Sequence, residues 1–314
     1  MTIAAALLLY VVVVLLGGST LLHRLTADGA APRMAIAAWL TAVVTVLGCA
    51  IVALALLLVE AAGHWHNSDE LLMSCLERVG AILLGHAGWP ARVVATTAVA
   101  IALGSCIAIF VRVARSVNRM RAHTFAHADA VRLVGKSHGD DVIIMDAPEP
   151  AAYCVAGRPP AIVVTTAALA ALDQRQLAAV VAHERAHLDG RHAYIIAAMR
   201  GLAAALPGIG LFTDAAARVC TLLEMCADDA AARQHGHQPL LAGLLALTGA
   251  HAPTHGLAAA SSDVLARAER LTHPRKGFAQ VRTRVGLSGA VAAMAAAPLA
   301  IIALAVSGAL ICFA

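Results

Sequence analysis

Two histidines and a glutamate in the run His183-Glu184-Arg185-Ala186-His187 have the types and spacing of a metal site with its own base. The surrounding stretch, 177–188, has no Gly or Pro and carries apolar residues at helical spacing, which predicts a helix. Residues four apart share one face of a helix, so His183 and His187 could hold the same divalent ion. Glu184 is turned by about 100° from His183, where it could take a proton from a water without binding the metal.

The same five residues also fit a surface helix turn with two solvated histidines, so the metal-site interpretation requires a third ligand. A catalytic zinc usually takes three protein ligands and leaves its fourth position to water. The stretch 221–233 is a second helix candidate without Gly or Pro, and we take its Glu224 as the third ligand. Asp228 lies one turn further on the same helix face, where it could accept a hydrogen bond from a zinc histidine and fix its tautomer.

The composition predicts a membrane protein. Of the 314 residues 60% are hydrophobic and only 13% are charged, and the mean hydropathy is +0.78. These values lie far from the balance of a soluble globular domain. Four stretches are long and apolar enough to cross a bilayer as helices: 2–22, 34–59, 93–111 and 285–314. The first has no basic segment before its apolar run, so we expect it to be retained and not cleaved as a signal peptide.

The distribution of Lys and Arg predicts the orientation. Basic residues gather between the first two spans, after the third and before the fourth, which places these segments in the cytoplasm. The loop 63–90 is richer in acidic residues and should face outward, with 70–84 as an amphipathic helix at the membrane interface. Both termini then lie outside, and the metal motif lies in the cytoplasm.

Charge and cysteine content exclude two classes of protein. The formal charge of +4 comes largely from residues beside the spans, so we expect no direct nucleic-acid partner. The seven cysteines are scattered without a Cys-x-x-Cys pair, which argues against a disulfide framework. His64 and His66 lack a third ligand nearby and are interpreted as solvated.

A small sheet is predicted before the metal helix, with strands at 141–145, 152–156 and 161–166. A short helix at 165–172 should follow, and Asp173 should cap the helix that carries the histidines. The basic stretch 117–134 is compatible with a helix and is interpreted as a linker along the membrane surface. The apolar stretch 194–212 cannot be a single crossing if Glu224 binds the metal, and we expect a helix that ends near Pro207-Gly208.

The two-part motif, His183-Glu184-x-x-His187 followed by Glu224-x-x-Ala227-Asp228, resembles the gluzincin arrangement of integral-membrane metallopeptidases of the BlaR/MecR antirepressor type and their Ste24/HtpX-like relatives. The succession of three spans, a peptidase domain and a fourth span is similar as well. The resemblance implies that His183, His187 and Glu224 bind Zn²⁺ and that Glu184 is the catalytic base. The β-lactam-binding domain that follows the last span in those sensors is not present before Ala314, so direct β-lactam sensing is not expected.

The expected fold is a mainly α-helical membrane protein. It has four transmembrane helices and a cytoplasmic α+β gluzincin-type zinc peptidase domain, with a small sheet beside the His-Glu-x-x-His helix. Residues 1–116 would form three transmembrane helices with the outer loop at 63–90. Residues 117–284 would form the peptidase domain, and 285–314 the fourth transmembrane helix. The resemblance places the protein in the cytoplasmic (inner) membrane.

The expected activity is zinc-dependent cleavage of a cytoplasmic protein, such as a transcriptional repressor in a signalling or resistance pathway. A role in membrane-protein quality control fits the same chemistry, and a non-catalytic, zinc-stabilised signalling scaffold is the rival of another class. A transporter is disfavoured because the four spans carry no charged residue away from their ends. Expected partners are the lipid bilayer, the protein substrate, and either a separate sensor protein or a second copy of the chain.

Several roles stay open. Tyr153, His192, Arg267 and Arg270 are candidates for stabilising the oxyanion. A metzincin interpretation would need a third histidine at Ala193, so His192 is read either as a neighbour of the zinc histidines or as solvated. A Cys154–His183 dyad has no third group to orient it. If the strand 161–166 is a sheet edge, it could hold an extended substrate by strand addition.

Overall fold

The computed structural model describes residues 3–63, 89–139, 141–249, 266–273 and 277–307. The predicted interfacial helix 70–84, His64 and His66 lie outside the described residues, as does the end of the fourth predicted span from 308 onward. The predictions for these segments therefore stay predictions.

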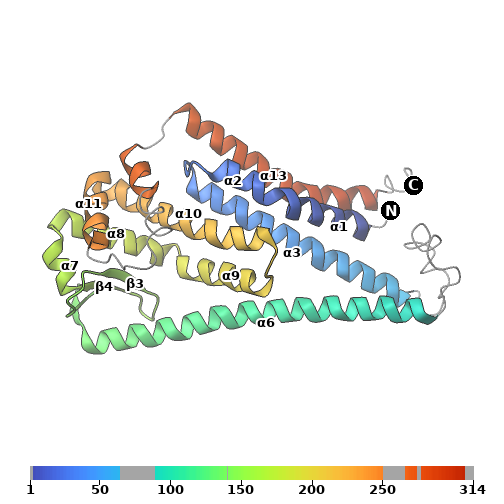
Figure 1. The fold of residues 1–314 in the computed structure, drawn as a ribbon, viewed down its shortest axis with the longest axis horizontal. Coiled ribbons are helices and arrows are strands. Elements are labelled where there is room, and N and C mark those ends of the chain that lie inside the picture. Colours follow the sequence, from blue (N-terminus) through green and yellow to red (C-terminus); the bar gives the residue numbers. More distant parts are fainter. Residues whose placement is uncertain (1–2, 64–88, 140, 250–265, 274–276, 308–314) are drawn as a thin grey trace.

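Most described residues are helical (Figure 1). The N-terminal helices are α1 (Ile3–Val13), the π-helical turn η1 (Val14–Gly18), α2 (Ser19–Thr26), α3 (Pro32–Gly63) and α6 (Trp89–Val134). Those after the strands are α7 (Thr166–Ala171), α8 (Gln174–Asp189), α9 (His192–Ala205), α10 (Gly210–His235), α11 (His237–Gly249) and α13 (Phe278–Val306). A further helical segment covers 266–272.

Four helical stretches are long and apolar enough to cross a membrane, namely Ile3–Thr26, Pro32–Leu58, Ala100–Val134 and Gln280–Ala305. Each overlaps one of the four predicted spans, although the third extends from Ala100 to Val134 where 93–111 was predicted, and they run along the long axis of the molecule (Figure 1). The sheet and the metal-motif helix α8 lie together at one end of this bundle. The four-span prediction is thus confirmed as far as helix length and composition are concerned.

The basic stretch 117–134 belongs to the helix α6, in agreement with its helix-compatible sequence, and its predicted place along the membrane surface stays a prediction. The helix α6 continues without a break from Trp89 to Val134 and passes through the predicted domain boundary at 116/117. No proline follows Pro90 within this helix, so no residue interrupts its backbone hydrogen bonds. The apolar first half of α6 and its basic second half are therefore parts of one long rod.

Four strands form a mixed sheet in the order β1-β2-β4-β3. Their bounds are β1 (Lys136–His138), β2 (Val142–Met145), β3 (Ala152–Val155) and β4 (Ala161–Thr165). The strand β4 pairs in parallel with β2 and antiparallel with β3, with Cys154 opposite Ile162. Three of these strands were predicted, and β1 was not, because its exposed sequence Lys-Ser-His has no apolar pattern.

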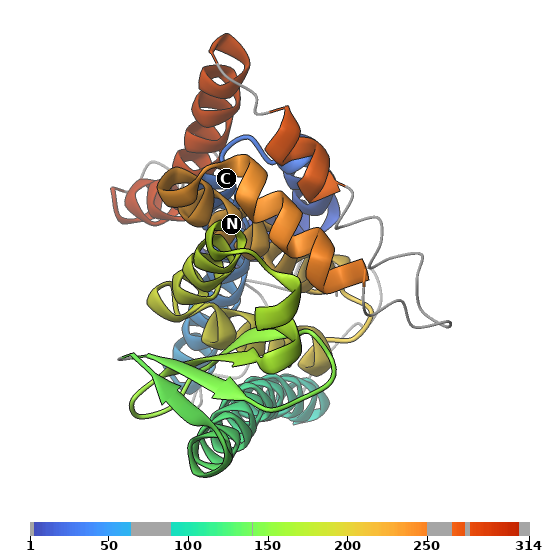
Figure 2. The same ribbon diagram turned by 90° about the vertical axis from the view of Figure 1, so that its left-hand side faces the viewer.

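The sheet lies between α6 and α8, as Figure 2 shows with α6 seen end-on. Alternate residues of β4 face the two helices: Val163 packs in a cluster with Val131 of α6, and Ile162 packs in a cluster with Val181 of α8. Because β4 is paired on both sides and covered on both faces, all five of its residues are buried. A strand in this setting is expected to read as a continuous apolar run.

The helix α9 is held tightly against α6. A Cβ atom added to Gly201 would lie 3.0 Å from the Ser116 Cβ and 3.3 Å from the Val113 Cα, so the two backbones approach closely at this point. The Ser116 hydroxyl donates to the carbonyl of Ala197 at 3.4 Å. The end of α9 at Ala205 agrees with the prediction of a helix that stops near Pro207-Gly208. The helix α9 also contacts α10, so it packs against both α6 and the helix that carries Glu224.

Candidate metal centre

The helix that carries the two histidines is capped by Asp173, as predicted, and the cap is a full capping box with Gln176. The Asp173 carboxylate accepts hydrogen bonds from the backbone N–H groups of Arg175 and Gln176, and the Gln176 side chain accepts one from the Asp173 N–H. These bonds satisfy N–H groups that the first turn of a helix leaves free. The uninterrupted helix that follows puts His183 and His187 on one face, with ring centroids 4.9 Å apart.

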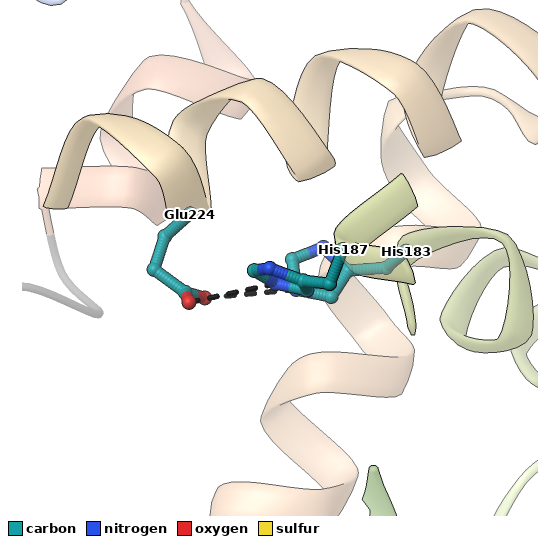
Figure 3. A group of neighbouring side chains, drawn as sticks. All are labelled: His183, His187 and Glu224. Carbon is teal, nitrogen blue, oxygen red and sulfur yellow. Dashed lines mark hydrogen bonds and ion pairs between the residues drawn. The ribbon is translucent and has the colours of Figure 1, made fainter. Parts of the chain in front are cut away.

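Glu224 reaches the same point from α10, as Figure 3 shows. The Nε2 atoms of His183 and His187 lie 3.2 Å apart. The Glu224 Oε2 lies 3.6 Å from the His183 Nε2, and its Oε1 lies 3.5 Å from the His187 Nε2. The three predicted ligand residues are therefore brought together from two separate helices.

The spacing of these atoms fits a single metal ion. A zinc ion with bonds of about 2.0–2.2 Å at tetrahedral angles would place its ligand atoms roughly 3.3–3.6 Å from one another. The observed separations of 3.2, 3.5 and 3.6 Å are close to this range, although the last two involve different oxygens of Glu224. With one atom taken from each residue, all three lie within 4.8 Å of one another. Within the described ranges no other group of three His, Cys, Asp or Glu residues converges in this way. The donor set, two imidazoles and one carboxylate, suits zinc.

Asp228 lies behind the His183 ring. Its side chain is 0% exposed, and its Oδ1 lies 3.2 Å from the His183 Nδ1. Burial alone would raise the pKa of Asp228, but the hydrogen bonds from Arg267 and the contact with His183 lower the pKa to about 2. Burial opposes the charged form of His183, yet Asp228 and Glu224 raise the pKa of its ring to about 9. Asp228 is therefore in contact with His183, as predicted, whereas its role toward a metal ligand stays a prediction.

His192 lies behind the other ring. Its Nδ1 is 2.8 Å from the His187 Nδ1, and the two rings meet edge to face. If the His187 Nε2 faces a metal, its Nδ1 carries the proton and donates to His192. Burial lowers the pKa of His187 to about 4. Of the two readings left open for His192, the solvated one is wrong, because the residue is buried beside a metal-site ring.

Glu184 stands beside the cluster and is not part of it. Its Oε2 accepts a hydrogen bond of 3.0 Å from the backbone N–H of Cys154 in β3. Burial raises the pKa of Glu184, and the negative charge of Glu224 acts in the same direction. A carboxylate with a raised pKa next to a metal cluster has the character of a general base.

A cavity of about 550 Å³ opens onto these groups. His183, His187, Glu184 and Glu224 line one part of it, and the remainder is formed by residues of β3, α6 and α9, including Tyr153, Met120 and Tyr194. The cavity therefore combines a candidate metal cluster, a candidate base and a mainly apolar lining in one connected space.

The sequence model of peptidase family M48 matches residues 118–224. This stretch is about a third of the chain, and it runs from the second half of α6 through the sheet and α8 to Glu224. Searches of curated proteins and of solved structures gave no match.

The M48 match supports the coarser part of the resemblance, a peptidase of a family that includes membrane zinc metallopeptidases. The match contains both histidines, Glu184 and Glu224, which are the residues that the structure gathers at the cavity. The narrower assignment to the BlaR/MecR type stays a prediction.

The structure separates the four oxyanion candidates. Tyr153 and His192 line the cavity together with the candidate metal ligands and Glu184. Arg267 and Arg270 are not among its lining residues. The two arginines instead bind carboxylates of α10, Asp228 and Asp229 respectively. The sequence contained a signal for this pairing, since two arginines three residues apart on a helix match two adjacent acids, but the sequence alone could not join the segments.

The structure decides two further points. The strand 161–166 is not a sheet edge, because β4 is paired with both β2 and β3, and the edge that lines the cavity is β3. The structure also agrees with the sequence argument against a Cys154–His183 dyad. Cys154 contacts Glu184, and burial, with the Glu184 charge adding to it, raises the pKa of the thiol to about 12, which keeps it protonated and unreactive.

Proposed function

We propose that the protein is a membrane-embedded, zinc-dependent endopeptidase that cleaves a protein substrate on the cytoplasmic side. The observation that carries this proposal is the position of Glu184 next to the His183, His187 and Glu224 cluster, in one cavity and within the M48 match. A metal cluster alone would serve a structural role equally well. Hydrolysis also requires a general base beside the metal. Glu184 suits this role, because it is a buried carboxylate with a raised pKa that lines the same cavity.

In this mechanism His183, His187 and Glu224 hold the ion. Bound zinc supplies a Lewis acid that makes water more acidic and polarises the scissile carbonyl. Glu184 takes the proton of the attacking water and passes it to the leaving nitrogen. Asp228 and His192 hold the two imidazole rings in the orientation that presents their Nε2 atoms to the ion.

The outer edge of β3, which pairs with no further strand among the described residues, supports a binding mode for an extended substrate. One side of β3 is paired with β4, and Tyr153 and Cys154 of β3 line the cavity. A peptide that added to this edge as a further strand would pass directly beside Glu184. The Cys154 N–H, which donates to Glu184 in this structure, would then be shared between the base and the incoming backbone.

The four candidate spans and the distribution of basic residues support the membrane part of the proposal. With the sheet and α8 at one end of the bundle, the substrate would be a cytoplasmic protein or the cytoplasmic segment of a membrane protein. A transcriptional repressor is the substrate that the family resemblance favours, and quality control of membrane proteins uses the same site.

The test compares the wild-type chain with Glu184→Gln in lipid nanodiscs, and in cells by quantitative proteomics of cleavage fragments. We expect Glu184→Gln to retain zinc and to lose both substrate cleavage and any self-cleavage. Glu269→Gln, an exposed Glu-to-Gln change outside the cavity, is the matched control and should cleave normally. Undiminished cleavage by Glu184→Gln would remove the peptidase assignment. Zinc binding without any Glu184-dependent fragment would favour the scaffold instead.

A further inference from the structure

Two arginines of the segment 266–272 face three carboxylates on α10. The carboxylates belong to Glu224, Asp228 and Asp229, and the arginines are Arg267 and Arg270, three residues apart. Both arginine side chains are largely buried, with exposed fractions of 14% and 16%. These ion pairs join α10, the helix that carries Glu224, to the segment 266–272, which lies beyond the end of the M48 match at residue 224.

Arg267 contacts two of these carboxylates at once. Its Nε donates to the Asp228 Oδ2 at 2.8 Å, and its Nη2 donates to the Asp228 Oδ1 at 2.7 Å. Its remaining terminal nitrogen, Nη1, lies 3.1 Å from the Glu224 Oε2. A single planar guanidinium therefore sets the distance between the Glu224 and Asp228 carboxylates.

Both of these carboxylates contact His183 of the candidate metal cluster. Glu224 supplies the third ligand group of that cluster, and the same Oε2 that meets Arg267 lies 3.6 Å from the His183 Nε2. Asp228 lies 3.2 Å from the His183 Nδ1 on the opposite side of that ring. Arg267 does not line the cavity, so its position does not suit contact with a substrate.

We propose that Arg267 is a positioning residue of the metal centre. Its guanidinium fixes the Glu224 carboxylate as a ligand and, through Asp228, fixes the His183 ring. The proposal rests on the metal centre of the proposed function, and it concerns metal binding and not the cleavage step.

The chemistry of the side chain explains why an arginine stands here. The guanidinium presents donors in a fixed planar fork, which can hold one carboxylate through two parallel bonds and still direct a nitrogen at a second. A lysine ammonium is a point charge on a flexible stem and lacks this fork. Groups that orient metal ligands typically change metal affinity by about 10- to 100-fold when they are lost.

Arg270 is a matched internal control. It belongs to the same segment, is buried to a similar extent, and also pairs with a carboxylate of α10, with its Nη1 2.7 Å from the Asp229 Oδ1. Its Nη2 donates to the carbonyl of Met225 at 3.0 Å, and it approaches Asp228 only to 3.9 Å. Loss of Arg270 therefore loosens the same contact between segments without releasing Glu224.

The experiment measures zinc affinity of the full chain in nanodiscs by competition with a chelator. The absorption spectrum of the Co²⁺-substituted protein reports the ligand geometry, which a loss of stability alone would not change. We expect Arg267→Met to weaken zinc binding by about 10- to 100-fold and to shift the Co²⁺ bands. Arg270→Met should lower thermal stability while its zinc affinity and Co²⁺ spectrum stay those of the wild type.

Arg267→Lys is a second variant for the case that Arg267→Met does not fold, because lysine keeps the positive charge opposite the buried carboxylates. It should bind zinc more weakly than the wild type, because it loses the fork. Wild-type zinc affinity and an unchanged Co²⁺ spectrum in Arg267→Lys and Arg267→Met would overturn the proposal, as would equal weakening by Arg267→Met and Arg270→Met. Failure of this proposal can be distinguished from failure of the proposed function. If the wild type binds zinc but cleaves no protein, the peptidase assignment fails, and the role of Arg267 is still tested by zinc affinity.

Discussion

The backbone N–H of Cys154 donates to the Oε2 of Glu184 at 3.0 Å, which ties the outer edge of β3 to the helix of the metal histidines. This bond places the candidate base where an added strand would lie, and it depends on the backbone of Cys154 and not on its thiol. The thiol and the peptide group of the same residue therefore have separable roles.

Cys154→Ala should leave cleavage unchanged, because it keeps the N–H donor and removes only the thiol. Since burial, reinforced by the Glu184 charge, raises the pKa of the thiol to about 12, almost none of it is ionised at pH 8, and alkylating reagents should label it slowly. Activity assays of the variant, and of wild type after treatment with iodoacetamide, measure this. Loss of cleavage in Cys154→Ala would revive the cysteine as a participant in the reaction.

His192→Phe should weaken zinc binding by about tenfold or more, because the His187 Nδ1 loses the acceptor that fixes its ring. The phenylalanine ring fills a similar volume, so the packing of α9 is retained. His192→Asn offers an acceptor oxygen and should bind zinc more tightly than His192→Phe. Chelator competition on the three proteins is the measurement, and equal affinities would show that His192 does not orient His187.

Zinc affinity should decrease as the pH falls from 9 toward 6. Burial opposes the charged form of His183, but Asp228 and Glu224 raise the pKa of its ring to about 9 in the metal-free site. Below that pH a proton occupies the ring, and zinc must displace it. His187 has a pKa lowered to about 4 and is already neutral in this range, so it contributes no proton. Calorimetry in buffers of different ionisation enthalpy should therefore detect close to one proton released per zinc at pH 7.

Asp228→Asn provides the control for this pH dependence. Removal of the carboxylate that supports the charged form of His183 lowers the pKa of that ring, so fewer protons should be released at pH 7. A proton count that stays the same in wild type and Asp228→Asn would contradict the assignment of the released proton to His183.

Gly201→Leu should destabilise the protein by roughly 1–3 kcal/mol, because the new side chain has no space between α9 and α6 and must displace Ser116 or the backbone at Val113. Gly289→Leu is the matched control, since no atom lies within 4 Å of a Cβ placed there in α13. The measurement is the melting temperature of each variant and of the wild type in lipid nanodiscs of the same composition. Equal melting temperatures would show that α9 and α6 are not in close contact.

The sequence by itself determined the features that depend on local spacing. The separation of His183 and His187 fixes them on one helix face, and a helix at 221–233 presents Glu224 and Asp228 on one face as well. Uninterrupted apolar length determined the four candidate spans. The cap at Asp173 was also predictable, because a capping box is made by residues within one turn.

Only the tertiary structure decided which strand forms the sheet edge and which residues stand behind the two metal-site rings. The buried run of β4 did carry a signal of a central strand, but strand order is set by pairings between distant segments, and periodicity does not encode it. The contact of Arg267 with Asp228 likewise joins residues 39 positions apart. Such contacts form only when the chain brings distant segments together to bury apolar surface, so no local pattern specifies them.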